Sequence, residues 1–234
     1  MEKLVFLLGD AEAGVVPRDR GDLRDTLLGL GDTLRDQGAL RADMTVADLD
    51  DPIADGVAQF NAYGLLDAKL SLWVDSVDIW PKVEKILLRL ATRVAAYLVT
   101  ESIPRALADH RPHPGARSPG VQLVTTFPRP DRLDLETFHA RWHGSHTPLS
   151  LETHPLLAYN RNSVARVLTP GVPRLDAIVH ESVASTQVVA DPVAFYRSRE
   201  DQKRVQEDLL SFVDFPELSM VLMNEYTLLV GSED

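Results

Sequence analysis

Histidines gather in one segment of the second half of the chain, where imidazole chemistry would be available at neutral pH. His139, His143 and His146 are spaced by four and then three residues, so a continuous α-helix would place all three in one narrow stripe. Clustered imidazoles titrate near neutral pH and transfer protons in both directions. The cluster therefore predicts a general acid–base site, and the structural alternative is that the rings pack along a helix edge.

An apolar stripe runs beside these histidines and supplies candidate walls for a pocket. Phe138 and Trp142 lie on it with Leu135 and Leu149, and this stripe must face a sheet. A pocket between helix and sheet would then open beside the imidazoles. Polar side chains on later strands are further candidates, although the alternation around His180 fits either face of a sheet. The candidate substrate-binding residues are His139, Phe138, Trp142, Tyr159, Asn162 and His180.

Residues 1–103 contain the patterns of strand, helix, strand, strand, helix and strand in that order. The apolar run at 4–8 is typical of a buried strand, and leucines at 23, 27, 30 and 34 recur at helical spacing before Gly38. Pro81 suits the first turn of a second helix. Further strands are expected over 41–49, 69–74 and 95–102.

Residues 104–119 carry four prolines and no apolar periodicity, a composition that is typical of a linker. Residues 120–234 then repeat the element order of the first half. Asp134 is a candidate helix cap, and Asp191 followed by Pro192 marks the start of a helix that should run to about residue 210. Strands are expected over 121–127, 159–168, 177–183 and 219–230.

Two βαββαβ units of about 100 residues each predict an α+β fold with two ferredoxin-like halves. Each unit would place two helices on one face of a four-stranded antiparallel sheet and leave the other face apolar and uncovered. The sheet of the other unit is the natural cover for that face. We therefore expect the two antiparallel sheets to pack face to face as an α/β barrel within one chain.

The segment around the histidines resembles the signature of the EthD family. Phe138, Trp142, His146 and the pair Pro148-Leu149 match its aromatic-x-x-x-Trp-x-x-x-His-x-Pro-Leu pattern, and Tyr159 opens the next strand as in that family. The resemblance covers residues from about 120 to 230. It implies the dimeric α/β-barrel fold. Family members with assigned roles act in ether degradation or in the tailoring of aromatic polyketides, and neighbouring families include cofactor-free monooxygenases and lactone isomerases.

The same resemblance implies that His146 is the main catalytic residue, and we place His143 beside it as the second catalytic candidate. The first half departs from the pattern, because its first helix lacks the Trp-x-x-x-His segment. We therefore expect the first half to be a structural partner, with a pocket of different chemistry as the alternative, and the chain to hold one catalytic site. Family members usually carry one copy and pair with a second molecule. This chain is expected to be a monomer with an internal pseudo-dimer, or a homodimer.

Three functions fit these residues. The first is a cofactor-independent enzyme that acts on an aromatic or polyketide-like hydrophobic substrate by histidine acid–base chemistry, as a dehydratase, cyclase, isomerase or monooxygenase. The second is a metal or haem site, because His139 and His143 have the spacing at which two imidazoles share a metal. The third is a non-catalytic ligand-binding or accessory protein of a catabolic or biosynthetic pathway. We favour the first, for which no cofactor and no metal are expected.

The composition of the chain limits the kinds of partner that it is expected to bind. The net charge of −11 disfavours nucleic acid and anionic lipid, both of which attract cationic surfaces. The chain has no cysteine, which removes thiolate nucleophiles and iron–sulfur clusters. It also lacks the G-x-G-x-x-G, Walker and G-x-S-x-G motifs. No apolar run approaches the length of a membrane span. We expect a cytoplasmic protein whose partner is a small-molecule substrate, with no nucleic acid and no membrane.

Overall fold

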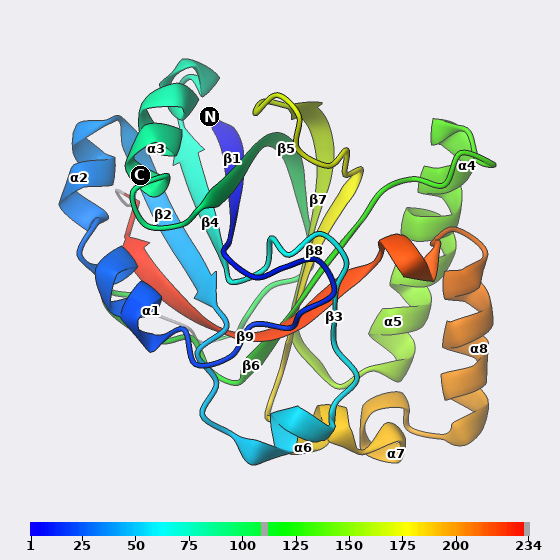
Figure 1. The fold of residues 1–234 in the computed structure, drawn as a ribbon. Coiled ribbons are helices and arrows are strands. Elements are labelled where there is room, and N and C mark those ends of the chain that lie inside the picture. Colours follow the sequence, from blue (N-terminus) through cyan, green and yellow to red (C-terminus); the bar gives the residue numbers. More distant parts are fainter. Residues whose placement is uncertain (109–111, 232–234) are drawn as a thin grey trace.

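The strands of both halves join in one antiparallel barrel in the computed structural model, which describes residues 1–108 and 112–231 (Figure 1). Residues 109–111 of the expected linker lie outside the described residues. The strands follow the order β2-β4-β1-β5-β7-β8-β6-β9, and β9 pairs back with β2 to close the circle. Their bounds are β1 Glu2–Gly9, β2 Ala39–Val46, β4 Ala68–Val74, β5 Arg93–Arg105, β6 Val121–Phe127, β7 Leu156–Val167, β8 Ala177–Val183 and β9 Ser219–Leu229.

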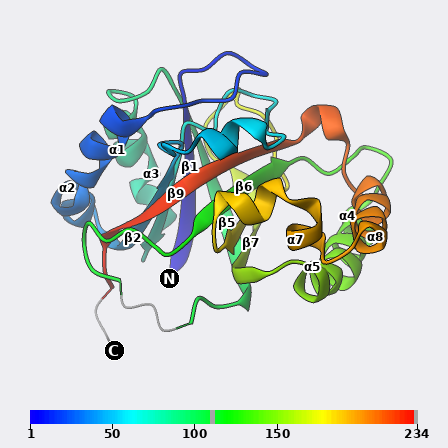
Figure 2. The same ribbon diagram turned by 90° about the horizontal axis from the view of Figure 1, so that it is seen from below.

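The two halves have the same strand order, as the prediction of two ferredoxin-like units requires. In the first half the order is β5-β1-β4-β2, and in the second it is β9-β6-β8-β7. When the strands are numbered within each half, both orders are fourth, first, third and second strand. The halves meet where β5 pairs with β7 and where β9 pairs with β2, and Figure 2 shows the second of these seams from below. The expected fold class is therefore confirmed.

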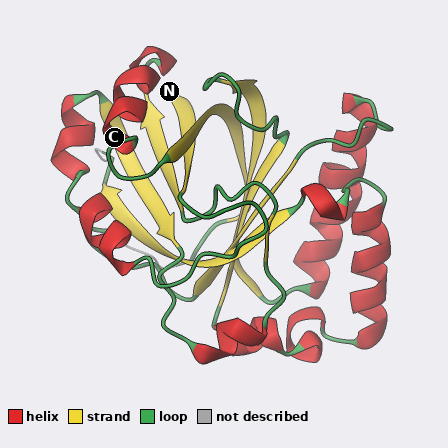
Figure 3. Cartoon of the chain, in the orientation of Figure 1, coloured by secondary structure: helices red, strands yellow, loops and turns green. Residues whose placement is uncertain are grey.

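Helices cover the outside of the barrel in two groups (Figure 3). One group lies against the first-half strands and the other against the second-half strands. Within the described residues, no helix is both long enough and apolar enough to cross a membrane. The first group is α1 Gly21–Leu28, α2 Gly31–Asp36 and α3 Trp80–Leu87, and the second is α4 Leu135–His139, α5 Thr147–Thr153, α6 Thr186–Ala190, α7 Pro192–Tyr196 and α8 Arg199–Leu210.

Two of the expected helices are interrupted. The helix expected through the leucines at 23 to 34 is split into α1 and α2 around Gly29, and Gly31 then packs against β9. A Cβ on Gly31 would lie 2.9 Å from the carbonyl oxygen of Leu228. The helix expected from Asp191 to about residue 210 is also split, because Arg197 has a φ of 65° and the Ser198 hydroxyl caps α8. The short strand β3, Phe60–Asn61, was not expected.

Alternation along each strand separates two environments. In β1, Leu4, Phe6 and Leu8 pack under the helices, whereas Val5 and Leu7 face the barrel interior. The interior is apolar at one end, where loop residues join the strands. At the other end it is lined by charged side chains, among them Lys3, Lys69 and Glu225. The apolar end includes Leu65, Leu66, Tyr97, Leu175 and Met223.

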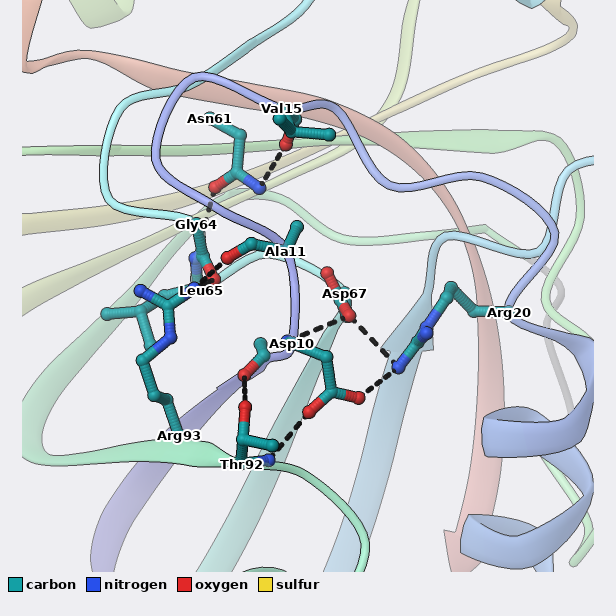
Figure 4. A network of polar contacts seen from close by, with 11 residues as sticks. Asp10, Ala11, Val15, Arg20, Asn61, Gly64, Leu65, Asp67, Thr92 and Arg93 are labelled. Atoms are coloured by element: carbon teal, nitrogen blue, oxygen red, sulfur yellow. Dashed lines mark hydrogen bonds and ion pairs between the residues drawn. The ribbon is translucent and has the colours of Figure 1, made fainter.

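A network of polar contacts, centred on the buried Asp67, fixes the loops at the apolar end of the barrel (Figure 4). Asp67 is 1% exposed and accepts a hydrogen bond from the backbone N–H of Asp10 at 3.0 Å. Arg20 lies 2.5 Å from the Asp10 carboxylate and 3.0 Å from that of Asp67. Asp10 also accepts from the backbone N–H of Thr92 at 2.6 Å. These contacts tie together the segments that follow β1, precede β4 and precede β5.

We expect Gly31→Ala to destabilise the protein by about 1–3 kcal/mol, because the added methyl group would push α2 away from the backbone of β9. In an ordinary helix the same change is stabilising. Gly29→Ala is the matched control, since its Cβ would meet the Thr26 carbonyl at 3.4 Å, and its effect should stay within about 1 kcal/mol. Urea denaturation measures both. Equal stabilities for the two variants would contradict the close approach of α2 to β9.

Candidate functional site

A π-helical segment carries the histidine cluster. Asp134 caps α4 by accepting from the Thr137 N–H at 2.7 Å, as expected, but the chain then widens into a π-helix over Ala140–His146 before α5. The His139 and His143 rings stack, with centroids 4.8 Å apart, whereas His146 packs its ring against Phe212. The three histidines therefore do not form the single stripe that regular α-helical geometry predicts. Single π turns are rare and often occur at functional sites.

His146 instead pairs with a carboxylate on another helix. Its Nδ1 lies 2.9 Å from Oδ2 of Asp208 in α8, and the two side chains are 13% and 16% exposed. Ser145 donates its hydroxyl hydrogen to the other Asp208 oxygen at 2.5 Å. Burial opposes ionisation of Asp208, but the hydrogen bonds from His146 and Ser145 outweigh it and lower the pKa of this carboxyl. Asp208 thus remains an ionised partner for the imidazole.

A small apolar cavity lies between this helical layer and the outer face of the second-half sheet. Its volume is about 100 Å³, and its lining includes three of the site residues proposed from the sequence, His146, Trp142 and Tyr159. Trp142 and Tyr159 are each only 1% exposed. Burial is the largest cause of the raised pKa of Tyr159, so its hydroxyl keeps its proton at neutral pH. The cavity also contains residues that sequence reasoning missed, namely His154, Glu181, Phe195 and Tyr196.

His154 is the most unusual of the missed residues. It is 7% exposed, its ring stacks on Phe195 with a centroid distance of 4.3 Å, and neither ring nitrogen has a hydrogen-bond partner in the described part of the chain. Its Nδ1 lies 3.9 Å from Oε1 of Glu181. Buried polar groups normally find partners, which makes His154 a candidate site residue. Only its position directly before the strand at 156 could have drawn attention to it.

Three of the predicted residues lie beside the cavity rather than on its lining. Phe138 is fully buried in an aromatic cluster with Phe127, Trp142 and Phe212, where it holds the helix on the sheet. His143 packs on Trp142 at 4.4 Å, next to His139. Burial is the largest cause that lowers the pKa of His143 to about 4, with Arg161 and His139 adding to it. His143 is therefore neutral at physiological pH and shapes the site through Trp142.

The remaining two predicted residues face the opposite side of the sheet. Asn162 is fully buried and donates its amide hydrogen to the carbonyl of Ile178 at 3.0 Å inside the barrel. His180 also points into the barrel, where Nε2 lies 2.7 Å from Oε1 of Gln122. Neither residue joins His146. Among the residues that the structure describes, no three His, Asp or Glu side chains are grouped to hold a metal ion.

Comparisons with known proteins agree with this architecture. Residues 130–216, which lie within the second half of the chain, match the EthD domain. The whole chain has the fold of the dimeric α/β-barrel proteins, in the form of two halves within one chain. No curated protein matches the sequence.

Solved structures match along nearly the full length. One is an anthrone oxidase-like protein, with 12% identity, a TM-score of 0.61, and coverage of 100% of this chain and 97% of the other. Another is a putative monooxygenase from Fusobacterium nucleatum subsp. nucleatum ATCC 25586, with 10% identity, a TM-score of 0.50, and coverage of 97% and 92%. At these identities the likeness shows the fold alone.

The neutral, buried His143 predicts a specific pH dependence of stability. The unfolded state takes up this proton near pH 6.5 and the folded state only near pH 4, so acid favours the unfolded state between those values. Solvent screens this partly exposed ring and reduces the effect, so His143→Gln should lose about 1–2 kcal/mol less stability than the wild type between pH 6.5 and pH 4. Denaturant unfolding at several pH values gives this difference. Parallel curves for the two proteins would contradict a depressed pKa at His143.

Proposed function

We propose that the second half is a cofactor-independent enzyme in which His146 transfers a proton to and from a hydrophobic aromatic substrate, polyketide-like in its chemistry. The observation that carries the proposal is the hydrogen bond between His146 Nδ1 and Asp208, formed at the wall of an apolar cavity. A paired histidine and carboxylate beside an aromatic cavity is the arrangement that general acid–base catalysis needs.

Asp208 acts as the positioning residue of this pair. Its ionised carboxylate accepts the Nδ1 hydrogen of His146, so the neutral ring presents the lone pair of Nε2 to a ligand. When Nε2 takes a proton, the same carboxylate stabilises the imidazolium that forms. His146 can then return the proton to another atom of the substrate. Isomerisation, dehydration and ring closure all use these two proton transfers in this order.

The cavity wall suits an aromatic carbon acid or phenol. Trp142, Phe195 and Tyr196 offer ring faces and edges for packing. His154 and Glu181 form the polar end, where a substrate hydroxyl or carbonyl would satisfy the unpartnered imidazole. Deprotonation of such a substrate yields a delocalised anion. That anion can rearrange, or it can react with dioxygen without a cofactor.

The cavity is smaller than a multi-ring substrate requires, because sites for drug-sized molecules usually have about 300–1,000 Å³. We infer that α8 moves outward to admit the substrate. Val205 is the one residue of this helix that is fully buried, so few apolar contacts resist the motion. Asp208 lies on α8, so the inward return of this helix would complete the pair with His146 only after the substrate is enclosed.

Anthrone is the first substrate to test, because a structural neighbour is described as anthrone oxidase-like and anthrone has an acidic benzylic methylene. Without oxygen, the enzyme should accelerate exchange of this methylene hydrogen with deuterated solvent, which NMR follows directly. In air, anthrone and dioxygen should yield anthraquinone and water. His146→Ala should reduce the exchange rate by about 10²–10⁴-fold. His113→Gln, which removes an exposed histidine, is the matched control and should leave the rate unchanged.

Asp208→Asn tests the positioning role separately. Exchange should slow while the KM for anthrone stays near its wild-type value, because the neutral amide no longer stabilises the imidazolium that forms and position 208 is not on the cavity lining. A merely structural loss would weaken anthrone binding as well. Full activity of His146→Ala would contradict the proposed base. Anthrone binding without exchange would instead support a ligand-binding protein, and a visible absorption band in the purified protein would support haem.

A further inference from the structure

The barrel interior contains a second, larger cavity of about 490 Å³. Small barrels are normally filled by their own side chains, and this volume is in the range of small-molecule sites. Because alternate residues of a strand face opposite sides, this cavity and the one beside His146 share walls but not residues. Gln122 and His180 point inward, whereas Leu123 and Val179 point to the helices. Its charged and polar end is formed by Lys3, Lys69, Trp73, Gln122, His180 and Glu225.

Lysines are few in this chain, and their placement is uneven. The sequence has five, and two of them, Lys3 and Lys69, are buried inside the barrel at 6% and 3% exposure. Lys3 is paired with Glu101 at 2.7 Å and lies over the Trp73 ring. Lys69 differs, because no carboxylate oxygen of the described residues lies within 4 Å of its Nζ. Its nearest polar contact is Nδ1 of His180, at 3.3 Å. A buried ammonium without a paired carboxylate is costly, and the neutral amine is the form that burial favours.

The surrounding groups reinforce that preference. Burial is the largest cause that lowers the pKa of Lys69 to about 8, and the charge of Lys3 adds to it, whereas Glu225, Asp43 and Glu101 oppose it. A useful fraction of the amine is therefore unprotonated at neutral pH. Buried lysines of this kind are the ones that form Schiff bases with carbonyl compounds.

Two groups near Lys69 can handle protons. His180 donates its Nε2 hydrogen to Gln122 Oε1, so the lone pair of Nδ1 faces Lys69. Burial and the two lysines keep the pKa of His180 well below its ordinary value, and the ring is neutral. Glu225 Oε1 lies 3.5 Å from the same Nδ1. Burial and Asp43 raise the pKa of Glu225 against the opposing effect of Lys69 and Ser118, so this carboxyl holds its proton more readily than usual.

An unpartnered amide gives an independent sign of a ligand. Gln122 is fully buried and lines the cavity, and its Nε2 has no hydrogen-bond partner among the described residues. Burying an amide N–H without a partner costs about 1–3 kcal/mol. A carbonyl or hydroxyl oxygen of a ligand bound beside Lys69 would accept from it. The amine, the imidazole, the carboxyl and the amide thus converge on one place in the cavity.

We propose that Lys69 forms an imine with a small aldehyde or ketone in the barrel cavity, which makes this a second ligand site, separate from the one at His146. The Nζ lone pair adds to the carbonyl carbon, the carbonyl oxygen takes the proton of Glu225, and His180 Nδ1 accepts a proton from the nitrogen. His180 returns that proton to the hydroxyl group, which leaves as water. The products are a protonated imine on Lys69, one water molecule and an ionised Glu225 that balances the charge of the imine.

Reductive trapping tests the proposal on the full chain. The protein is incubated with benzaldehyde at pH 7 and then treated with sodium borohydride, which reduces an imine to a stable secondary amine. Intact mass should rise by one benzyl group, and peptide mapping should place it on Lys69. The exposed lysines 82, 85 and 203 are internal references, and Lys69 should be labelled at least about tenfold more than any of them. Labelling that favours the exposed lysines, or Lys3, would overturn the proposal.

Variants complete the test. Lys69→Arg keeps a cation but no nucleophilic amine, and it should abolish the specific label, whereas Lys203→Arg should retain it. Glu225→Gln removes the acid and should slow labelling at least about tenfold. If Lys69→Arg does not fold, as judged by circular dichroism, the peptide map of the labelled wild-type protein is sufficient to test the proposal. His146→Ala should label as the wild type does, so failure of one site can be told apart from failure of the other.

Discussion

Closure of the barrel at two seams is the constraint on which the rest of the structure depends. Pairing of β5 with β7 and of β9 with β2 leaves no open edge among the eight barrel strands, and strands such as β1 and β4 are buried on both faces. In β1, one face meets helices and the other faces the barrel interior. Two kinds of cavity become possible as a result, one outside the sheet under the helices and one within the barrel, and alternate residues of the same strands supply their walls.

The two halves use the same scaffold differently because their helical layers have different side chains. In the first half, leucines fill the space, and glycine at position 31 lets α2 approach the backbone of β9 closely. In the second half, Phe127, Phe138, Trp142 and Phe212 meet edge to face, and the apolar cavity lies beside these rings. His146, at the wall of that cavity, meets Asp208 of α8. The site that we propose in the second half thus rests on a packing of the helical layer that differs from that of the first half.

Much of the fold could be predicted from the sequence, because strand order and barrel closure follow from local periodicity and two repeated patterns. The strands at 121–127 and 177–183 were predicted with the bounds that they have. Helix interruptions were not, since the close contact of Gly31 with β9 and the positive φ of Arg197 arise from tertiary packing. The π-helix escaped prediction for a similar reason. No local pattern in Ala140–His146 distinguishes it from an α-helix.

The sites follow the same division between local and long-range information. His146, Trp142 and Tyr159 could be proposed together from the sequence because they lie within one helical segment and the strand after it. Asp208 could not, because 62 residues separate it from His146 and only the packing of α8 on the π-helical segment joins them. For His180, the residue type suggested a functional role, but the sequence did not show which face of the sheet the side chain is on. A shift of one residue in strand register decides which of the two cavities it enters. Its partners Lys69 and Glu225 come from strands of opposite halves, and only barrel closure brings those strands together.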